Sequence, residues 1–498
     1  MVGITAFGGY IPRLRMSRKA IVDANSWANP ALKSQAKSER AICNWDEDPV
    51  TMAVEAARDC LGDRDRTSVA SLYFASTSAP FDDRLNGGIV AQALLLGDEV
   101  ATLDIAHSQR AGTSALIAAA GAVGAGRKPA LVIAAEQRRT AAASQLELTS
   151  GDGAVALLLG PDDGVARLIA HHSVAVDFVD HYRGHGREFD YVWEERWIRD
   201  EGYNKIVPPV IDALIEKAGV AGKDIAHFCL PCTLPRVAVG IAKRAGIAET
   251  SVRDNLHAGC GDTGASHPLV MLAHALEQAR PGDRILVAGF GQGCDALLFE
   301  VTAAIAGARP ASGITGSLAR GKTETNYQKY LAFNDLVKIE KGLRAEVDKQ
   351  TPLSTLYRKR DMILGFVGGR CRTCGTVQFP KSRICVNPNC NALNTQDDQP
   401  FADFPAKTLS WSADYLTYSA DPPAHYGMVQ FEEGGRLMAD FTDVDVGKVE
   451  VGMPMRMVFR IKERDPQRGF VRYFWKAAPA RALSGEAVNS TGSMKAEA

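Results

Sequence analysis

The stretch Asp104-Ile105-Ala106-His107-Ser108-Gln109-Arg110-Ala111-Gly112-Thr113 is the most informative part of the 498-residue chain. It has the layout of a strand end followed by the start of a small-residue helix, which the Ala- and Gly-rich run 114–126 continues. This is the form of a catalytic nucleophile loop, which presents its reactive side chain at a helix N-terminus. The residues at this helix start include Gln109, and a carboxamide is not a nucleophile. The loop therefore indicates a fold more directly than a reaction.

Residues 1–305 contain the same order of structural parts twice. Apolar runs that predict strands, at 71–75, 130–134 and 155–159, alternate with longer Ala-rich stretches that predict helices, which indicates a layered α/β fold. A repeat of whole supersecondary units is a stronger signal than any single motif. The matching segments are 71–78 with 227–233, 104–126 with 255–279, and 151–159 with 291–299.

Three further segments carry a family resemblance. They are ITAFGGYIP at 4–12, DEDPVTMAVEAAR at 46–58 and GDRILVAGFGQG at 282–293. With the duplicated halves, they resemble hydroxymethylglutaryl-CoA synthase of the archaeal type and, more distantly, ketoacyl synthase III and thiolases. The resemblance implies a thiolase-like α-β-α-β-α fold with halves at 1–165 and 166–305. It also implies an acyl-CoA substrate, carbon–carbon bond chemistry next to the thioester, and a homodimer or larger homo-oligomer.

The resemblance places every family catalytic residue on an altered position. That family uses a cysteine that carries the acyl group, a histidine, and a glutamate or asparagine. The acyl cysteine falls on Gln109 and the glutamate on Thr77. The histidine falls on Cys229 or, in another alignment, on Cys232, and the asparagine falls at or beside Asp262. A carboxamide cannot carry an acyl group, so covalent catalysis of the family type is not expected at Gln109.

These departures predict a pocket for non-covalent thioester chemistry. An aldol or retro-aldol step needs only a base and hydrogen-bond donors to the enolate oxygen. We expect Asp262 to be the base with a pKa raised by burial, His267 to orient it, His107 to be a further proton-transfer candidate, and Gln109 to be an amide donor. Three alternatives stay open: decarboxylation with glutamine in place of the cysteine, Claisen-type acyl transfer by Cys229 or Cys232, and a non-catalytic scaffold that passes thioesters between enzymes.

Four of the ten cysteines, Cys371, Cys374, Cys385 and Cys390, lie within twenty residues of one another. Cysteine pairs on two short knuckles supply four thiolates at tetrahedral spacing, which is the arrangement of a structural zinc site. The second knuckle has four residues between its cysteines, longer than the usual two. Because four protein ligands leave no open coordination position, the predicted zinc is structural rather than catalytic.

The C-terminal part predicts several smaller units: a linker with helices at 306–355, a zinc ribbon at 356–395, a small barrel at 396–480 and a disordered tail at 481–498. The barrel rests on five β-like runs, at 407–412, 426–431, 436–441, 455–461 and 470–475. A zinc ribbon followed by such a barrel resembles the DUF35 family, whose members have an OB-fold and accompany thiolase-like enzymes.

Composition and charge exclude several functional classes. Hydrophobic residues make up 46% and charged residues 23% of the chain, as in ordinary globular proteins, and the net charge of −1 gives no reason to expect nucleic acid. Arg456, Arg460 and Arg472 with Trp475 would suit nucleic acid on the barrel, but we expect a solvated face or contact with the CoA phosphates there. No apolar run reaches the roughly 18–20 residues of a membrane span and no signal peptide is evident, which predicts a cytoplasmic protein without a membrane partner.

Overall fold

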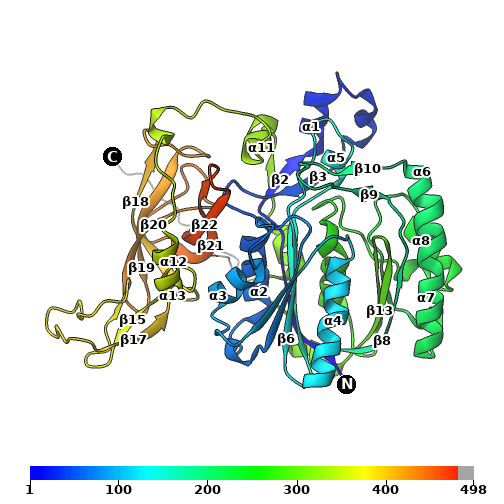
Figure 1. Ribbon diagram of the computed structural model, residues 1–498, viewed down its shortest axis with the longest axis horizontal. Coiled ribbons are helices and arrows are strands. Elements are labelled where there is room, and N and C mark those ends of the chain that lie inside the picture. The colour runs from blue at the N-terminus through cyan, green and yellow to red at the C-terminus, as the bar shows by residue number, and fades with distance from the viewer. Residues whose placement is uncertain (481–498) are drawn as a thin grey trace, which may run out of the picture.

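The computed structural model describes residues 1–480, which form an α/β body and a smaller β-rich part beside it (Figure 1). Nine strands build the sheet of the body, in the order β11-β12-β13-β8-β1-β7-β6-β4-β5. The predicted α/β class is confirmed. The strands are β1 (Gly3–Tyr10), β4 (Ser71–Ala75), β5 (Ala101–Ile105), β6 (Ala130–Glu136), β7 (Gly153–Gly160), β8 (Ala166–Ala175), β11 (His227–Cys229), β12 (Arg284–Phe290) and β13 (Gly293–Val301).

The strand order confirms the predicted duplication. From its outer edge to the centre, the first half runs β5-β4-β6-β7-β1 and the second half runs β11-β12-β13-β8, so the halves meet where β1 pairs with β8. The second half has no full strand opposite β5. A single parallel bridge between Phe228 and Val252 stands in its place.

Helices α4 (Ala111–Gly126) and α9 (His267–Gln278) pack between the two halves, and their apolar residues share one core with strands of both. The outer layers consist of α2 (Pro49–Leu61) and α3 (Asn86–Leu94) on one side and α7 (Asn204–Ala218) and α8 (Val237–Arg244) on the other. The small residues of α4 have a steric reason. A Cβ on Gly112 would lie 2.3 Å from the carbonyl oxygen of Ala265, so only glycine lets the two central helix starts approach this closely.

The segment predicted to be a linker with helices is partly built into the body. Within it, β14 (Lys322–Glu324) pairs in parallel with β2 (Leu14–Ser17), which also pairs with β3 (Glu39–Ile42). This difference arises because apolar side chains of the segment are buried against the body. The other elements here and at the top of the body are α1 (Arg18–Asn25), α5 (Leu146–Thr149), α10 (Gly313–Ala319), α11 (Tyr327–Phe333), α12 (Leu353–Arg358) and α13 (Arg360–Ile363).

The β-rich part contains two sheets. The first has the order β16-β15-β17 and carries the cysteine knuckles; the second has the order β20-β19-β18-β21-β22. A parallel bridge between Phe441 and Ala477 joins the end of β20 to β22, which closes the five strands into a small barrel. Four of the five predicted runs lie within strands, and the fifth, 436–441, extends one residue beyond β20. The strands are β15 (Val367–Cys371), β16 (Val377–Gln378), β17 (Gln396–Pro400), β18 (Ala406–Asp414), β19 (Ala424–Phe431), β20 (Arg436–Asp440), β21 (Pro454–Asp465) and β22 (Phe470–Pro479).

The barrel docks on the body through a buried ionic cluster. Arg460 is fully buried, and its guanidinium lies 3.1 Å from Glu47, 3.1 Å from Asp443 and 3.0 Å from the Tyr10 hydroxyl. Beside it, Lys476 lies 2.9 Å from a carboxylate oxygen of Asp46. Apolar residues of the barrel and of the first half also share one core.

The expectation of a solvated or CoA-binding barrel face is wrong for Arg460 and Trp475, which are buried, and for Arg456, which pairs with the body, whereas Arg472 is partly exposed. Arg456 lies 2.7 Å from Glu55 of α2, and the indole N–H of the buried Trp475 donates to the Leu364 carbonyl. Arg472 and Glu463, which both belong to the barrel, form an ion pair at 2.6 Å. The body supplies Glu55 to Arg456 and Glu47 to Arg460, and these pairings could not be read from the barrel sequence alone.

Within residues 1–480, no helix combines the length and the apolar character required to cross a membrane. The segment predicted to be a disordered tail, 481–498, lies outside the described residues.

Candidate active site and metal centre

Gln109 lies between the end of β5 and the start of α4. Ser108 Oγ donates to the Gly291 carbonyl at 2.9 Å and so ties this loop to the turn between β12 and β13. Gln109 Nε2 lies 3.2 Å from His181 Nε2, and Gln109 Oε1 is buried without a hydrogen-bond partner among the described residues. The neighbouring His107 is exposed and has a φ of 70°. The carboxamide thus faces inward, while His107 stands at the rim.

The start of α4 already carries a buried negative charge. Asp295 of β13 pairs with the Arg110 guanidinium at 2.7 Å and accepts hydrogen bonds from the hydroxyls of Thr113 and Ser114 at 2.9 and 2.7 Å. A carboxylate at a helix N-terminus offsets the positive end of the helix dipole. This helix start is therefore less able to stabilise a second anion, such as a nucleophilic thiolate.

A buried carboxyl group lies against Thr77, the position on which the family resemblance places a glutamate. It comes from Glu136 at the end of the neighbouring strand β6. The Thr77 N–H donates to Glu136 Oε1 at 2.6 Å, and Ser78 Oγ donates to Oε2 at 2.5 Å. Burial raises the pKa of Glu136 despite these hydrogen bonds. Sequence reasoning missed this residue, although an acidic residue at the end of the apolar run 130–135 was a usable signal.

Three side chains converge on Gly264, which has a φ of 57°. A Cβ there would lie 2.9 Å from Gln109 Oε1, 3.0 Å from Arg138 Cδ and 3.4 Å from Glu136 Cγ. The Gly264 N–H also donates to Asp262 Oδ1 at 2.9 Å. The loops of Gln109 and Asp262, one from each half, therefore meet at this glycine.

Asp262 does not have the raised pKa that was expected. Burial alone would raise it, but His267, His257, Arg138 and the Gly264 N–H outweigh burial and lower the pKa of Asp262 below its usual value. Its side chain is 27% exposed. Asp262 is therefore an ionised, partly accessible carboxylate rather than a protonated buried acid.

His267 is engaged by the protein on both ring nitrogens. Nδ1 lies 3.0 Å from the Thr263 backbone N–H, and Nε2 lies 2.7 Å from the Asn255 carbonyl. The imidazole is fully buried, and Nδ1 is 3.9 Å from Asp262. Hydrogen bonds to Thr263 and Asn255 therefore hold the His267 ring beside Asp262, and an orienting role for His267 stays a prediction.

The two candidate acyl-carrier thiols are buried. Cys229 is fully buried in the central core, and burial raises its pKa to about 12. Burial likewise raises the pKa of Cys232 to about 12, and its side chain is 6% exposed. A nucleophilic cysteine needs an accessible, low-pKa thiolate. Neither residue meets this requirement, which argues against the acyl-transfer alternative.

Several polar side chains that sequence reasoning missed lie near His181 or Asp262. Asp180 lies 3.0 Å from Nδ1 of His181. Arg138, which lies next to Gly264, forms a buried ion pair with Asp190. The Tyr203 hydroxyl donates to the Pro231 carbonyl at 3.3 Å, and burial, reinforced by the negative charge of nearby acidic groups, raises its pKa well above the usual value. Their distance along the chain from Gln109 left no local signal that could place them there.

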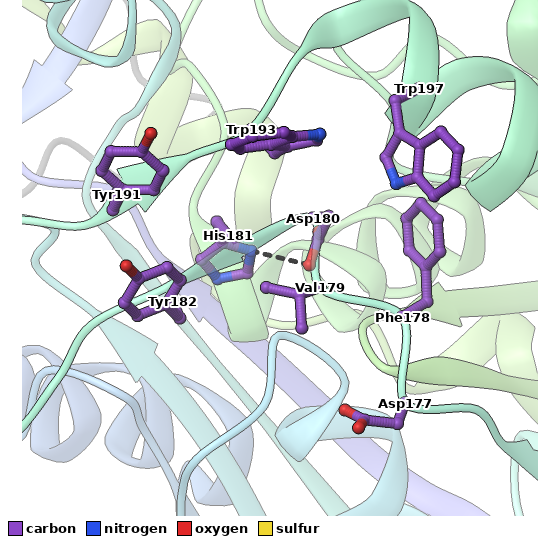
Figure 2. Close-up of a pocket in the computed structure, with 9 residues that line it drawn as sticks. All are labelled: Asp177, Phe178, Val179, Asp180, His181, Tyr182, Tyr191, Trp193 and Trp197. Carbon is purple, nitrogen blue, oxygen red and sulfur yellow. Dashed lines mark ion pairs between the residues drawn. The ribbon is translucent and has the colours of Figure 1, made fainter.

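Next to His181, a pocket of about 320 Å³ opens within the segment between β8 and α7 (Figure 2). This segment includes β9 (His181–Tyr182), β10 (Tyr191–Val192) and α6 (Glu195–Trp197). The pocket is lined by Asp177, Phe178, Val179, Asp180, His181, Tyr182, Tyr191, Trp193 and Trp197.

The four predicted metal-ligating cysteines come together. The sulfur atoms of Cys371, Cys374, Cys385 and Cys390 all lie within 4.8 Å of one another, with Cys371 to Cys390 at 3.9 Å and Cys374 to Cys385 at 3.5 Å. Zinc–sulfur bonds of about 2.3 Å require tetrahedral sulfur separations of about 3.8 Å, so the donor set fits zinc. The two extra residues of the second knuckle form a turn, in which Cys390 N–H donates to the Asn387 carbonyl at 2.9 Å.

Three segments of the chain match known protein families. Residues 215–300 match the family described as 3-oxoacyl-[acyl-carrier-protein] synthase III C-terminal. Residues 365–395 match the rubredoxin-like zinc ribbon domain of ChsH2, and residues 409–460 match the C-terminal OB-fold domain of ChsH2.

The similarity to known proteins covers most of the body. Hydroxymethylglutaryl-CoA synthase of Caldivirga maquilingensis is 28% identical over 350 residues, which are 68% of this chain and 99% of that protein. The synthase of Methanosarcina mazei is 29% identical over 349 residues, with the same coverage.

Solved structures show the same fold. An HMG-CoA synthase complexed with CoA matches with a TM-score of 0.58 and 17% identity over 70% of this chain and 95% of that chain. 3-Oxoacyl-[acyl-carrier-protein] synthase III of Aquifex aeolicus matches with a TM-score of 0.55 and 19% identity over 60% of this chain and 100% of that chain. The chain therefore joins a thiolase-like body, similar to hydroxymethylglutaryl-CoA synthases, to segments that match the zinc ribbon and the OB-fold of ChsH2.

Proposed function

We propose that the protein makes or breaks a carbon–carbon bond in a CoA thioester without an acyl-enzyme intermediate, by an aldol or retro-aldol step. The similar proteins named hydroxymethylglutaryl-CoA synthase, and the neighbour complexed with CoA, support a CoA-thioester substrate. The observation that carries the proposal is the chemistry around Gln109. The site offers a carboxylate, an amide and a phenol, whereas its two thiols are buried and have pKa values near 12.

In the cleavage direction, the Asp262 carboxylate accepts the proton of the β-hydroxyl group. The Cα–Cβ bond breaks, its electron pair forms the thioester enolate, and the β-carbon leaves as a ketone or aldehyde. Asp262 suits this role because its lowered pKa keeps it ionised at neutral pH and its side chain is partly exposed.

Gln109 and Tyr203 supply the remaining groups. The Gln109 amide directs one N–H toward His181 and has a second N–H with which to stabilise the enolate oxygen. Tyr203 keeps its proton because its pKa is raised, and it delivers that proton to Cα. The proton held by Asp262 then returns to the Tyr203 oxygen, so the cycle leaves both groups unchanged.

The test is to incubate the purified full chain with β-hydroxyacyl-CoA thioesters and with malonyl-CoA, and to identify products by mass spectrometry. We expect cleavage of at least one β-hydroxyacyl-CoA. Loss of a general base typically costs about 10²–10⁴-fold, so Asp262→Asn should lose activity by at least that lower figure. Asp283→Asn is the matched control, because Asp283 pairs with His227 at the other end of β12.

Three results would contradict the proposal. Activity confined to malonyl-CoA would favour decarboxylation, and a stable acyl mass on Cys229 or Cys232 would favour acyl transfer. CoA binding with no turnover across the panel would favour a scaffold.

We also infer that the chain forms a homodimer through β5. This strand is an outer edge of the nine-stranded sheet, and Leu103 on it is 47% exposed. An unpaired strand edge is a template for pairing with a second copy. Light scattering should give twice the chain mass, and Leu103→Asp should reduce it; a monomeric wild-type protein at micromolar concentration would contradict the inference.

A further inference from the structure

The pocket beside His181 has an aromatic wall that is open to solvent. Phe178 and Trp197 stack with ring centroids 5.9 Å apart, and Tyr191 contacts Tyr182 and Trp193 at 5.5 and 6.4 Å (Figure 2). Trp193 is 53% and Trp197 is 46% exposed. An exposed apolar surface of this kind, gathered in a concave site, is characteristic of ligand binding.

The polar side chains of the pocket, His181 and Asp180, lie between its aromatic side chains and connect it to the candidate active site (Figure 2). Gln109 is the donor toward Nε2 of His181, which leaves the Nδ1 proton to be donated to Asp180. Gln292 Nε2 lies 3.5 Å from the same Asp180 oxygen. A ligand in this pocket therefore lies against His181, whose Nε2 contacts the Gln109 carboxamide.

The pocket is preformed. The hairpin of β9 and β10 is held by Asp190, which pairs with Arg138 and, at 2.9 Å, with Arg183. The Trp193 N–H donates to the Asp180 carbonyl at 2.9 Å, so the two walls are tied by backbone contacts as well. A rigid site has little ordering cost on binding.

The lining also restricts the chemistry of the ligand. It contains the acidic residues Asp177 and Asp180 and no lysine or arginine, so it does not favour phosphate groups. Its volume of about 320 Å³ equals that of about ten liquid water molecules at about 30 Å³ each, which is room for about ten non-hydrogen atoms.

We propose that this pocket binds the apolar acyl portion of the thioester, and that the substrates are acyl-CoA thioesters with a long or ring-containing hydrocarbon group rather than an acetyl-sized one. The inference rests on the proposed function, because it takes Gln109 as the position of the thioester or enolate oxygen. The hydrocarbon then lies against Trp193 and Trp197, and the nucleotide of CoA lies outside the pocket.

The test measures binding by calorimetry, separately from turnover, with free CoA, acetyl-CoA, octanoyl-CoA and cyclohexanecarbonyl-CoA. Each buried methylene should tighten binding by up to about fourfold, so octanoyl-CoA should bind at least about tenfold more tightly than acetyl-CoA. Trp193→Ala should weaken octanoyl-CoA binding by about tenfold and acetyl-CoA binding by less than about twofold. Trp27→Ala is the matched control, because Trp27 is 84% exposed and outside the pocket.

Two results would overturn the inference: equal affinity for acetyl-CoA and octanoyl-CoA, or an equal loss of free CoA and octanoyl-CoA binding in Trp193→Ala, which would place the nucleotide in the pocket. The outcomes separate this inference from the proposed function. Chain-length preference and its loss in Trp193→Ala without any turnover would support the pocket and contradict the lyase. Cleavage of short β-hydroxyacyl-CoA thioesters without chain-length preference would support the lyase and contradict the acyl-binding pocket.

Discussion

Replacing Arg460 by leucine should strongly destabilise the protein. The Arg460 guanidinium is fully buried between the barrel and the body, where it faces the carboxylates of Glu47 and Asp443 at 3.1 Å each. A third carboxylate, Asp46, lies 3.9 Å away. The substitution removes the shared cation and leaves the carboxylates in a low-dielectric environment.

The expected magnitude follows from burial. Removing one partner of a buried ion pair costs about 3–5 kcal/mol, because the remaining charge is uncompensated. Arg472→Leu is the matched control: Arg472 lies in the same barrel and pairs with Glu463, but the two side chains are 31% and 23% exposed. Exposed pairs contribute about 0–1 kcal/mol, so the control should change stability by no more than that.

Urea unfolding followed by tryptophan fluorescence measures the difference, because Trp475 lies in the shared core and Trp45 contacts Lys476. Adding Glu47→Gln and Asp443→Asn to Arg460→Leu should restore part of the lost free energy, because the uncompensated charges are then removed. If Arg460→Leu is no less stable than Arg472→Leu, the buried cluster does not hold the barrel on the body.

Three further predictions concern the site and the metal. The pKa of Asp262 is lowered, so its ionised form persists as pH falls. Loss of kcat/KM through protonation of Asp262 should therefore occur only below about pH 4. A decrease of kcat/KM near pH 6 that disappears in Asp262→Asn would contradict this. Iodoacetamide at neutral pH should leave Cys229 and Cys232 unmodified in the folded chain, because both thiols are buried and protonated. Peptide mass mapping measures the modification, and rapid labelling of either cysteine would contradict the prediction. Chelation should release one zinc per chain and increase hydrogen exchange in β15–β17 but not in β1 or β7, whereas a purified protein without zinc would contradict the assignment.

Much of the fold could be predicted because its signals are local. The apolar runs at 71–75, 130–134 and 155–159 lie within β4, β6 and β7, and the repeat of parts predicted the two halves that the strand order confirms. Cysteine spacing predicted the zinc ribbon for the same reason, since both knuckles are short segments whose ligands are close in sequence.

The candidate site was only partly predictable, because its residues come from distant segments. The loops of Gln109 and Asp262 were identified from their own sequences, and the structure brings them together at Gly264. His181 and Glu136 were missed, since each reaches the site from a strand or hairpin whose sequence carries no catalytic motif.

The sequence by itself determined which residues could not act: a carboxamide at Gln109 carries no acyl group, whatever surrounds it. It also determined the layered α/β class and the zinc ligands, because periodicity and spacing are properties of single segments. Only the tertiary structure decided the state of each side chain. The pKa of Asp262, the hydrogen bonds of Gln109 with His181 and the burial of Arg460 depend on groups from segments far away in the chain, and those environments exist only once the chain is folded.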